Sequence, residues 1–152
     1  MKQKSLFADS RAPSSAPTAY IDGGARGNPG PAAYGVVVRN AEGKMLAELA
    51  KYLGVQTNNF AEYSALLAAL EYAQQQNFPG LKVFSDSELL VRQMKGEYKV
   101  SHPVLRILHG RAQELARRLQ YFSIHHVLRN YNREADGLVN AVLDLEGKKQ
   151  RI

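Results

Sequence analysis

The sequence contains no cysteine and no tryptophan, and its longest uninterrupted apolar run is Ala65–Leu70. The absence of cysteine excludes a disulfide framework, a thiolate zinc site, a cysteine nucleophile and a cysteine-bound iron–sulfur cluster. A membrane-spanning helix needs about 18 apolar residues in succession, so this run is far too short to cross a bilayer. Residues 1–17 (MKQKSLFADSRAPSSAP) contain no apolar core typical of a signal peptide. We therefore expect a cytoplasmic protein that makes no membrane contact.

The length and the distribution of charge predict one domain with basic ends. A chain of 152 residues suits a single domain that folds without a metal or a disulfide. The net charge is +6, of which residues 1–16 carry +2 and residues 146–152 carry another +2. We expect residues 1–16 to form a flexible basic extension, residues 17–146 the folded domain and residues 147–152 a basic tail. Solvated charged ends explain this balance as well as a nucleic-acid partner does.

The hydrophobic periodicity predicts an α/β fold. Alternating or short buried patterns predict five strands, at residues 18–22, 32–39, 44–53, 81–85 and 122–128. Patterns with a helical period predict four helices, at residues 59–76, 87–95, 103–119 and 134–145. Turns join the first three strands, whereas helices precede the last two. This order predicts an antiparallel meander followed by strands that pair in parallel.

Two finer expectations concern which side chains are buried. In the helix at 103–119, one face should pack on the core, and it comprises Val104, Leu108, Ala112, Leu115 and Leu119. The opposite face, with Arg106, His109 and Arg117, should point to solvent. In the last strand, alternation should send one of His125 and His126 inward.

The glycine-rich segment at residues 23–31 does not match a phosphate-binding loop. It lacks a Gly-Lys-Ser/Thr ending, and the element that follows it is a strand, so neither the P-loop nor the dinucleotide fingerprint fits. We interpret the segment as a turn. Its contribution to function would come from Asp22 before it and from its backbone amides.

Four acidic residues stand where α/β folds place their sites. Asp22 and Asp86 end predicted strands, and Glu62 and Asp136 lie in the first turns of predicted helices. Because sites form at the carboxyl ends of strands in open α/β sheets, we expect Asp22 and Asp86 to be neighbours. Carboxylates at such short distances repel one another unless a cation lies between them. Mg²⁺ is a suitable cation because it prefers oxygen ligands. The pattern predicts an acidic metal site.

Each acid also has a purely local explanation. Asp22-Gly23 is an ordinary turn pair. Asn59-x-x-Glu62 and Ser85-x-x-Glu88 match capping boxes, and the second contains Asp86. Asp136 complements the positive end of a helix dipole. From the residues alone, a metal site and a set of local structural roles both stay open.

Four segments together resemble type 1 ribonuclease H (ribonuclease HI). They are YIDGGARGNPGP at 20–31, TNNFAE at 57–62, FSDS at 84–87 and EADGLVN at 134–140. Their order and spacing match the family over residues 18–145. The resemblance implies a ribonuclease H-like five-stranded mixed sheet, three strands antiparallel and then two parallel, with helices on both faces.

The resemblance also implies an activity. It is the endonucleolytic hydrolysis of the RNA strand of RNA–DNA hybrids, which leaves 3′-hydroxyl and 5′-phosphate ends. The alternatives are a non-catalytic hybrid-binding module of the same fold, which an intact acid set disfavours, and a DNA-strand nuclease or transposase-like enzyme. The implied partner is the RNA–DNA hybrid, and the implied oligomeric state is a monomer.

The resemblance assigns roles residue by residue. Asp22, Glu62, Asp86 and Asp136 would be catalytic and would hold two Mg²⁺ ions, for which Mn²⁺ could substitute. Asp22 would bridge the two ions, and Glu62 would also reach the RNA 2′-hydroxyl. Six further residues would contact substrate, namely Gly23, Ala25, Asn28, Thr57, Asn58 and Asn59.

The sequence departs from the family pattern at several positions. The loop at residues 129–133 lacks the histidine that the best-studied bacterial members carry, so Arg129 or Asn132 would take its auxiliary role. Only residues 96–101 stand where many members have a basic, tryptophan-bearing handle. Val55 and Glu88 replace an arginine and a glutamine. These departures predict altered substrate affinity with the same reaction.

Overall fold

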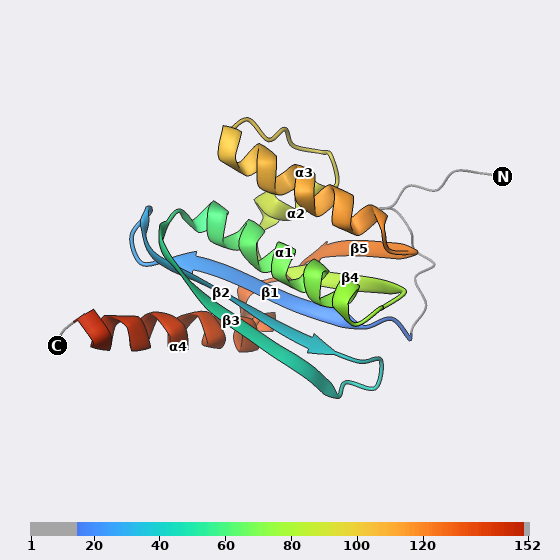
Figure 1. Ribbon diagram of the computed structural model, residues 1–152, viewed down its shortest axis with the longest axis horizontal. Helices are drawn as coiled ribbons and strands as arrows, with labels where there is room; N and C mark the ends of the chain where they lie inside the picture. The colour runs from blue at the N-terminus through green and yellow to red at the C-terminus, as the bar shows by residue number, and fades with distance from the viewer. Residues whose placement is uncertain (1–14, 151–152) are drawn as a thin grey trace.

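The structure is a computed structural model that describes residues 15–150, without the side chain of Gln150 (Figure 1). Most of the basic extension predicted at residues 1–16 therefore lies outside the described residues, as do the last two residues of the predicted tail. Ala16, at the end of that predicted extension, is buried against the domain with 1% of its surface exposed.

The centre of the fold is one five-stranded mixed sheet. Its strands are β1 (Thr18–Ala25), β2 (Gly30–Arg39), β3 (Met45–Gln56), β4 (Gly80–Ser85) and β5 (Tyr121–His126). Their spatial order is β3-β2-β1-β4-β5, with β3-β2-β1 antiparallel and β1-β4-β5 parallel. This confirms the predicted fold class.

Helices cover both faces of the sheet (Figure 1). They are α1 (Asn58–Gln75), α2 (Glu88–Met94), α3 (Pro103–Arg117) and α4 (Arg133–Gln150). The main core lies between the sheet, α1 and α3, and its largest fully buried side chains are Tyr63 and Phe122. A smaller cluster of Ala33, Val139 and Leu143 joins α4 to the opposite face.

Strand β1 is longer than predicted. Gly23, Gly24 and Ala25 continue the antiparallel ladder with β2, and the turn is confined to residues 26–29. Asp22 consequently lies inside β1 and not at its end. The parallel partner β4, however, stops pairing at Ile21 and Ser85, so Asp22 is the first residue of β1 beyond the end of β4.

The predicted faces of α3 are partly wrong. Val104 is 45% exposed, and Leu105 is buried in its place. His109 does not point to solvent, because its Nε2 lies 3.1 Å from the Gln93 carbonyl oxygen and its ring meets the edge of Tyr63. A histidine can bury its ring when a partner satisfies its nitrogen, and polarity alone does not show this.

Strand β5 and helix α4 also differ from their predicted ends. β5 stops at His126, and neither His125 nor His126 is buried, although the His125 ring stacks on Phe84 with centroids 5.0 Å apart. α4 continues through residues 147–150, which the sequence analysis assigned to the tail. Acids in its first turn and Lys148 and Lys149 in its last turn complement the helix dipole, which favours the longer helix.

Candidate active site

A cleft of about 340 Å³ lies beside β1, beyond the end of β4, and all four predicted acids line it. Asp22 comes from the middle of β1, Glu62 from α1, Asp86 from the β4–α2 connection and Asp136 from the start of α4. Elements from both faces of the sheet therefore supply the acids of one site.

Three of the acids form a tight cluster. Carboxylate oxygens of Asp22, Glu62 and Asp86 all lie within 4.8 Å of one another. Asp22 is only 7% exposed and Glu62 only 9% exposed, so water solvates their charges poorly. Three carboxylates at this separation form a donor set suited to a hard cation such as Mg²⁺.

Glu62 is held toward the cleft by the backbone of β1. Helix α1 begins at Asn58, and its N-cap is Thr57, whose hydroxyl oxygen accepts from the Phe60 amide at 3.1 Å. The expected capping box from Asn59 to Glu62 is therefore wrong, and Glu62 lies in the second turn. Its Oε1 instead accepts a hydrogen bond of 2.8 Å from the Gly23 amide.

The Asp86 carboxylate likewise does not cap a helix. Ser87 caps α2 by accepting from the Leu90 amide at 3.2 Å, so the predicted capping box from Ser85 to Glu88 is absent. Glu88 pairs with Arg92 at 2.9 Å. The Asp86 carboxylate remains directed to the cleft.

Asp136 stands next to this cluster, in the first turn of α4 as expected. Its backbone amide donates to the Asn132 carbonyl oxygen at 3.2 Å, and its Oδ2 accepts from Asn140 at 3.3 Å. The carboxylate of Asp136 is close enough to that of Asp22 to raise the pKa of Asp22. Asp22 therefore neighbours both the three-acid cluster and Asp136.

The cleft penalises negative charge. Burial, followed by the charges of Asp86 and Asp136, raises the pKa of Asp22 to about 8. Burial and the charges of Asp22 and Asp86 also raise the pKa of Glu62 well above its usual value, which the Gly23 amide and Arg129 offset in part. Such carboxyl groups stay ionised at neutral pH only when a cation balances them.

Three of the six predicted substrate-contacting residues, Ala25, Asn28 and Asn58, form a linked group at one side of the cleft. The Ala25 amide donates to Asn58 Oδ1 at 2.8 Å, and the Asn58 amide donates to Asn28 Oδ1 at 3.0 Å. Thr57, the N-cap of α1, and Asn59, in its first turn, are exposed nearby. Hydrogen bonds thus fix the glycine-rich turn to the start of α1.

Gly23 also has a packing role, which the sequence pattern does not reveal. A Cβ on Gly23 would overlap the backbone of Ala61 and Glu62. The glycine therefore lets β1 approach α1 closely, independently of any contact with a nucleic acid.

The two auxiliary candidates separate. Arg129 lines the acid cleft and acts on Glu62 electrostatically. Asn132 is not among the residues that line it, and its Nδ2 donates to the Ile21 carbonyl oxygen at 2.8 Å.

Sequence reasoning missed two polar residues of the cleft, Arg26 and Asn140. Arg26 donates to Asn140 Oδ1 at 3.3 Å and pairs with Asp144 at 2.8 Å. Asn140 follows Asp136 by one helical turn, and this spacing was the available signal.

Comparisons with known proteins agree with this geometry. A family model described as "Reverse transcriptase-like" matches residues 20–142. A protein of Halobacterium salinarum named Ribonuclease HI is 44% identical over 126 residues, which cover 83% of this chain and 63% of that protein. A "Bifunctional protein" of Mycobacterium tuberculosis is also 44% identical, but the matched part is only 34% of its length. The chain thus spans less than two thirds of these relatives.

Within the described residues, no helix is both long and apolar enough to cross a membrane.

Solved structures match over nearly their full length. The RNase H1 of Halobacterium salinarum has a TM-score of 0.81 at 44% identity, covering 84% of this chain and 97% of that one. The N-terminal RNase H domain of the Mycobacterium tuberculosis protein gives a TM-score of 0.85 at 40% identity, with coverages of 90% and 99%. LC11-RNase H1, solved in complex with an RNA/DNA hybrid, gives 0.81 at 41% identity, with coverages of 86% and 98%. Sequence, sheet topology and strand order agree together, and this chain belongs to the type 1 ribonuclease H family.

Proposed function

We propose that this protein is an endonuclease that hydrolyses the RNA strand of RNA–DNA hybrids and leaves 3′-hydroxyl and 5′-phosphate ends. The observation that carries the proposal is the cluster of Asp22, Glu62 and Asp86, with Asp136 beside it, in one cleft. The complex of LC11-RNase H1 with an RNA/DNA hybrid supports the choice of substrate. Because one chain supplies every acid of the cleft, we expect a monomer to be active. The cytoplasmic location stays a prediction from the sequence.

The residues present fit a divalent cation. Four carboxylates supply hard oxygen ligands. The raised pKa of Asp22 reflects the unfavourable gathering of negative charge in the buried cleft, which a cation would offset. We assign Asp22, Glu62, Asp86 and Asp136 as the ligands of two Mg²⁺ ions, with Mn²⁺ as a substitute. Asp22, which neighbours both parts of the set, would be the shared ligand. Two ions held by these residues would supply activation of a water and stabilisation of the leaving oxygen in an in-line displacement.

The protein groups orient this site and the strand. The Gly23 amide holds the Glu62 carboxylate. Glu62 would contact the RNA 2′-hydroxyl, the group that distinguishes RNA from DNA. The linked group of Ala25, Asn28 and Asn58 presents backbone and amide groups beside the acids, where the RNA backbone would lie. Thr57 and Asn59 would contact the minor groove. Arg129 would balance charge at the cleft after cleavage.

A cleavage assay tests the proposal. Matched RNA–DNA, RNA–RNA and DNA–DNA duplexes are incubated with the protein in Mg²⁺ or in EDTA. We expect cleavage of the RNA strand of the hybrid only, and only with Mg²⁺. Asp22→Asn keeps the shape of the side chain but removes the shared charge, so its rate should fall by orders of magnitude while hybrid binding survives.

The control is Glu114→Gln, which removes a carboxylate on the exposed face of α3, away from the cleft. It should cleave like the wild type. A wild-type protein that binds the hybrid without cutting it would instead identify a non-catalytic hybrid-binding module. Substantial cleavage by folded Asp22→Asn protein would contradict the assignment of the site.

Metal binding should also be visible as stability. A cation that binds only the folded state stabilises it by RT ln(1 + [L]/Kd), about 2.7 kcal/mol at 100 times Kd. We expect millimolar Mg²⁺ to raise the melting temperature of the wild type. Asp86→Asn relieves repulsion, so it should melt higher than the wild type without metal and respond less to Mg²⁺. An unchanged wild-type melting curve in millimolar Mg²⁺ would argue against a metal site.

A further inference from the structure

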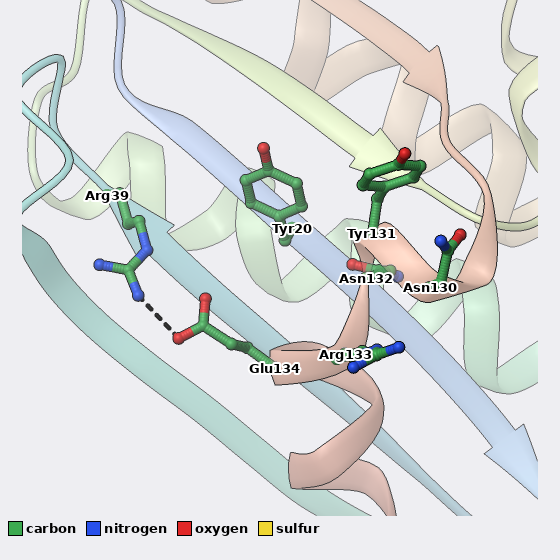
Figure 2. A pocket seen from close by; sticks show the side chains of 7 residues that line it. All are labelled: Tyr20, Arg39, Asn130, Tyr131, Asn132, Arg133 and Glu134. Carbon is green, nitrogen blue, oxygen red and sulfur yellow. Dashed lines mark hydrogen bonds and ion pairs between the residues drawn. The ribbon is translucent and has the colours of Figure 1, made fainter.

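A second pocket, of about 300 Å³, lies behind the loop that leads into α4 (Figure 2). Its walls come from β1, β2 and residues 130–134, and none of the four acids lines it. Asn132, which the sequence analysis considered for the active site, lines this pocket instead.

Asn132 presents an unused hydrogen-bond acceptor there. The Nδ2 of Asn132 donates to the Ile21 carbonyl oxygen, which fixes the orientation of the amide. Its Oδ1 is the one buried side-chain nitrogen or oxygen atom of the described residues that has no hydrogen-bond partner. Figure 2 shows this oxygen on the side of the pocket that faces Tyr20 and Glu134. Leaving a buried acceptor unpaired costs about 1–3 kcal/mol, so the pocket favours a ligand that donates an N–H or O–H.

Aromatic rings border the same pocket. One face of Tyr20 is stacked on Phe84, with ring centroids 5.1 Å apart and 18° between the planes. This stacking holds the Tyr20 ring in place at the wall of the pocket. Tyr131 stands at the rim, 67% exposed.

The charges of the pocket favour an anion. Arg39 is paired with Glu134 at 2.7 Å and also donates to the Gly43 carbonyl oxygen at 2.8 Å. Arg133 is exposed, and no side-chain hydrogen bond or ion pair joins it to another described residue. The two arginines and one glutamate leave a net charge of +1, with Arg133 available for a phosphate.

We propose that this pocket binds a nucleotide. The base would lie against Tyr20 and, after a shift of the pocket wall that uncovers the buried Asn132 Oδ1, would donate an N–H to this oxygen. Arg133 would hold the phosphate. A volume of about 300 Å³ is at the lower end of small-molecule pockets and suits one nucleotide. The nucleotide could be free or could be an unpaired residue of a nucleic-acid strand. The inference goes beyond the proposed hydrolysis and does not depend on it.

The pocket has a direct connection to the active site. The backbone oxygen of Asn132 accepts a hydrogen bond from the Asp136 amide. The side-chain Nδ2 of Asn132 donates to the carbonyl oxygen of Ile21, which precedes Asp22 in the chain. A ligand on Asn132 Oδ1 would therefore contact the residue that joins β1 to the start of α4.

The test is a nuclear magnetic resonance titration of the full ¹⁵N-labelled chain in EDTA. Without metal, the acid cleft repels phosphate, so binding there does not interfere. The probes are the four ribonucleoside 5′-monophosphates, a short single-stranded DNA of mixed sequence, and inorganic phosphate. We expect the nucleotide probes to shift the side-chain amide of Asn132 and the Tyr20 backbone amide, and inorganic phosphate to leave both unmoved. The mononucleotide and DNA arms distinguish a free nucleotide from a strand.

Two exposed positions provide variants that should fold. Arg133→Ala and Tyr131→Ala should each weaken binding, the first about tenfold, as expected for one charged hydrogen bond. Arg106→Ala removes another exposed arginine, on α3, and should bind like the wild type. Unmoved Asn132 resonances with every nucleotide probe, equal affinity in all these variants, or an equal response to inorganic phosphate would overturn the proposal.

Discussion

At the scale of single residues, the side chain with the largest consequences is Asp22. Its carboxylate is nearly inaccessible to water and adjoins three other acids. Ionising it without a cation is therefore costly, and the same property that makes the site attract a divalent cation makes the metal-free protein sensitive to pH.

The raised pKa of Asp22 predicts that metal-free stability falls as pH rises. The pKa of the Asp22 carboxyl is 3.8 in the unfolded chain, its ordinary value, and about 8 in the folded protein. Between these values the folded state binds more protons, so the free energy of unfolding decreases with increasing pH until about pH 8. Denaturant unfolding in EDTA at a series of pH values measures this slope.

Asp22→Asn should flatten that slope, because it removes the titrating group, although Glu62 would keep part of it. Asp144→Asn, at an exposed carboxylate paired with Arg26, is the matched control and should keep the wild-type slope. If Asp22→Asn and the wild type show the same slope, the Asp22 carboxyl is not the group responsible.

At the scale of elements, the contact between β1 and α1 sets the position of two of the acids. Gly23 makes this close approach feasible, and its amide also holds Glu62. We predict that Gly23→Ala destabilises the protein by about 1–3 kcal/mol, the usual cost of overpacking, because the added methyl meets backbone that cannot move aside. Thermal and denaturant unfolding provide the measurement.

The neighbouring Gly24→Ala is the control for this prediction. Its Cβ would meet only Val139 Cγ1, at an ordinary 3.6 Å, so stability should change little. Equal stability of the two variants would show that the glycine is needed for something other than helix packing, such as approach of the RNA backbone.

The elements also show what sequence patterns can and cannot reveal. Periodicity predicted the order of strands and helices correctly, because burial on one face repeats along each element. It placed the end of β1 too early, since a Gly-Gly pair usually breaks a strand, whereas here the β2 ladder continues through it. Periodicity also assigned His109 to the solvent-facing side of α3, which is wrong. The contact of His109 with the Gln93 carbonyl oxygen is tertiary, and no local pattern contains it.

The candidate site shows the same division. The four acids could be selected from the sequence because their motifs resemble those of one family. Other contacts join residues that are far apart in the chain. The Gly23 amide donates to Glu62, Arg26 donates to Asn140, and Asn132 donates to the Ile21 carbonyl oxygen. Such contacts follow only from the folded arrangement.

At the scale of the whole molecule, the distribution of charge predicts a role for the N-terminal residues in substrate attraction. Residues 1–14 contain Lys2, Lys4 and Arg11 and lie outside the described residues. Each phosphate neutralised changes the slope of log affinity against log salt by about 0.9, so deleting residues 1–14 should flatten it by at most about 2.7. KM should rise and kcat should stay nearly unchanged.

The truncation should stop before residue 15, because the burial of Ala16 indicates that the folded domain already includes it. A full-length variant with Lys2, Lys4 and Arg11 replaced by glutamine separates charge from length. If both proteins keep the wild-type salt dependence of hybrid cleavage, these residues do not contact substrate.

The contribution of four separate elements to one cleft has a consequence for biosynthesis. A chain leaves the ribosome from its N-terminus at about 5–20 residues per second, and among the described elements α4 is made after all the others. A nascent chain that ends before Arg133 already contains Asp22, Glu62 and Asp86 but lacks Asp136, and β2 lacks the Val139 and Leu143 side chains that cover it. The order of translation thus delays a complete set of acids until the opposite face of the sheet is closed.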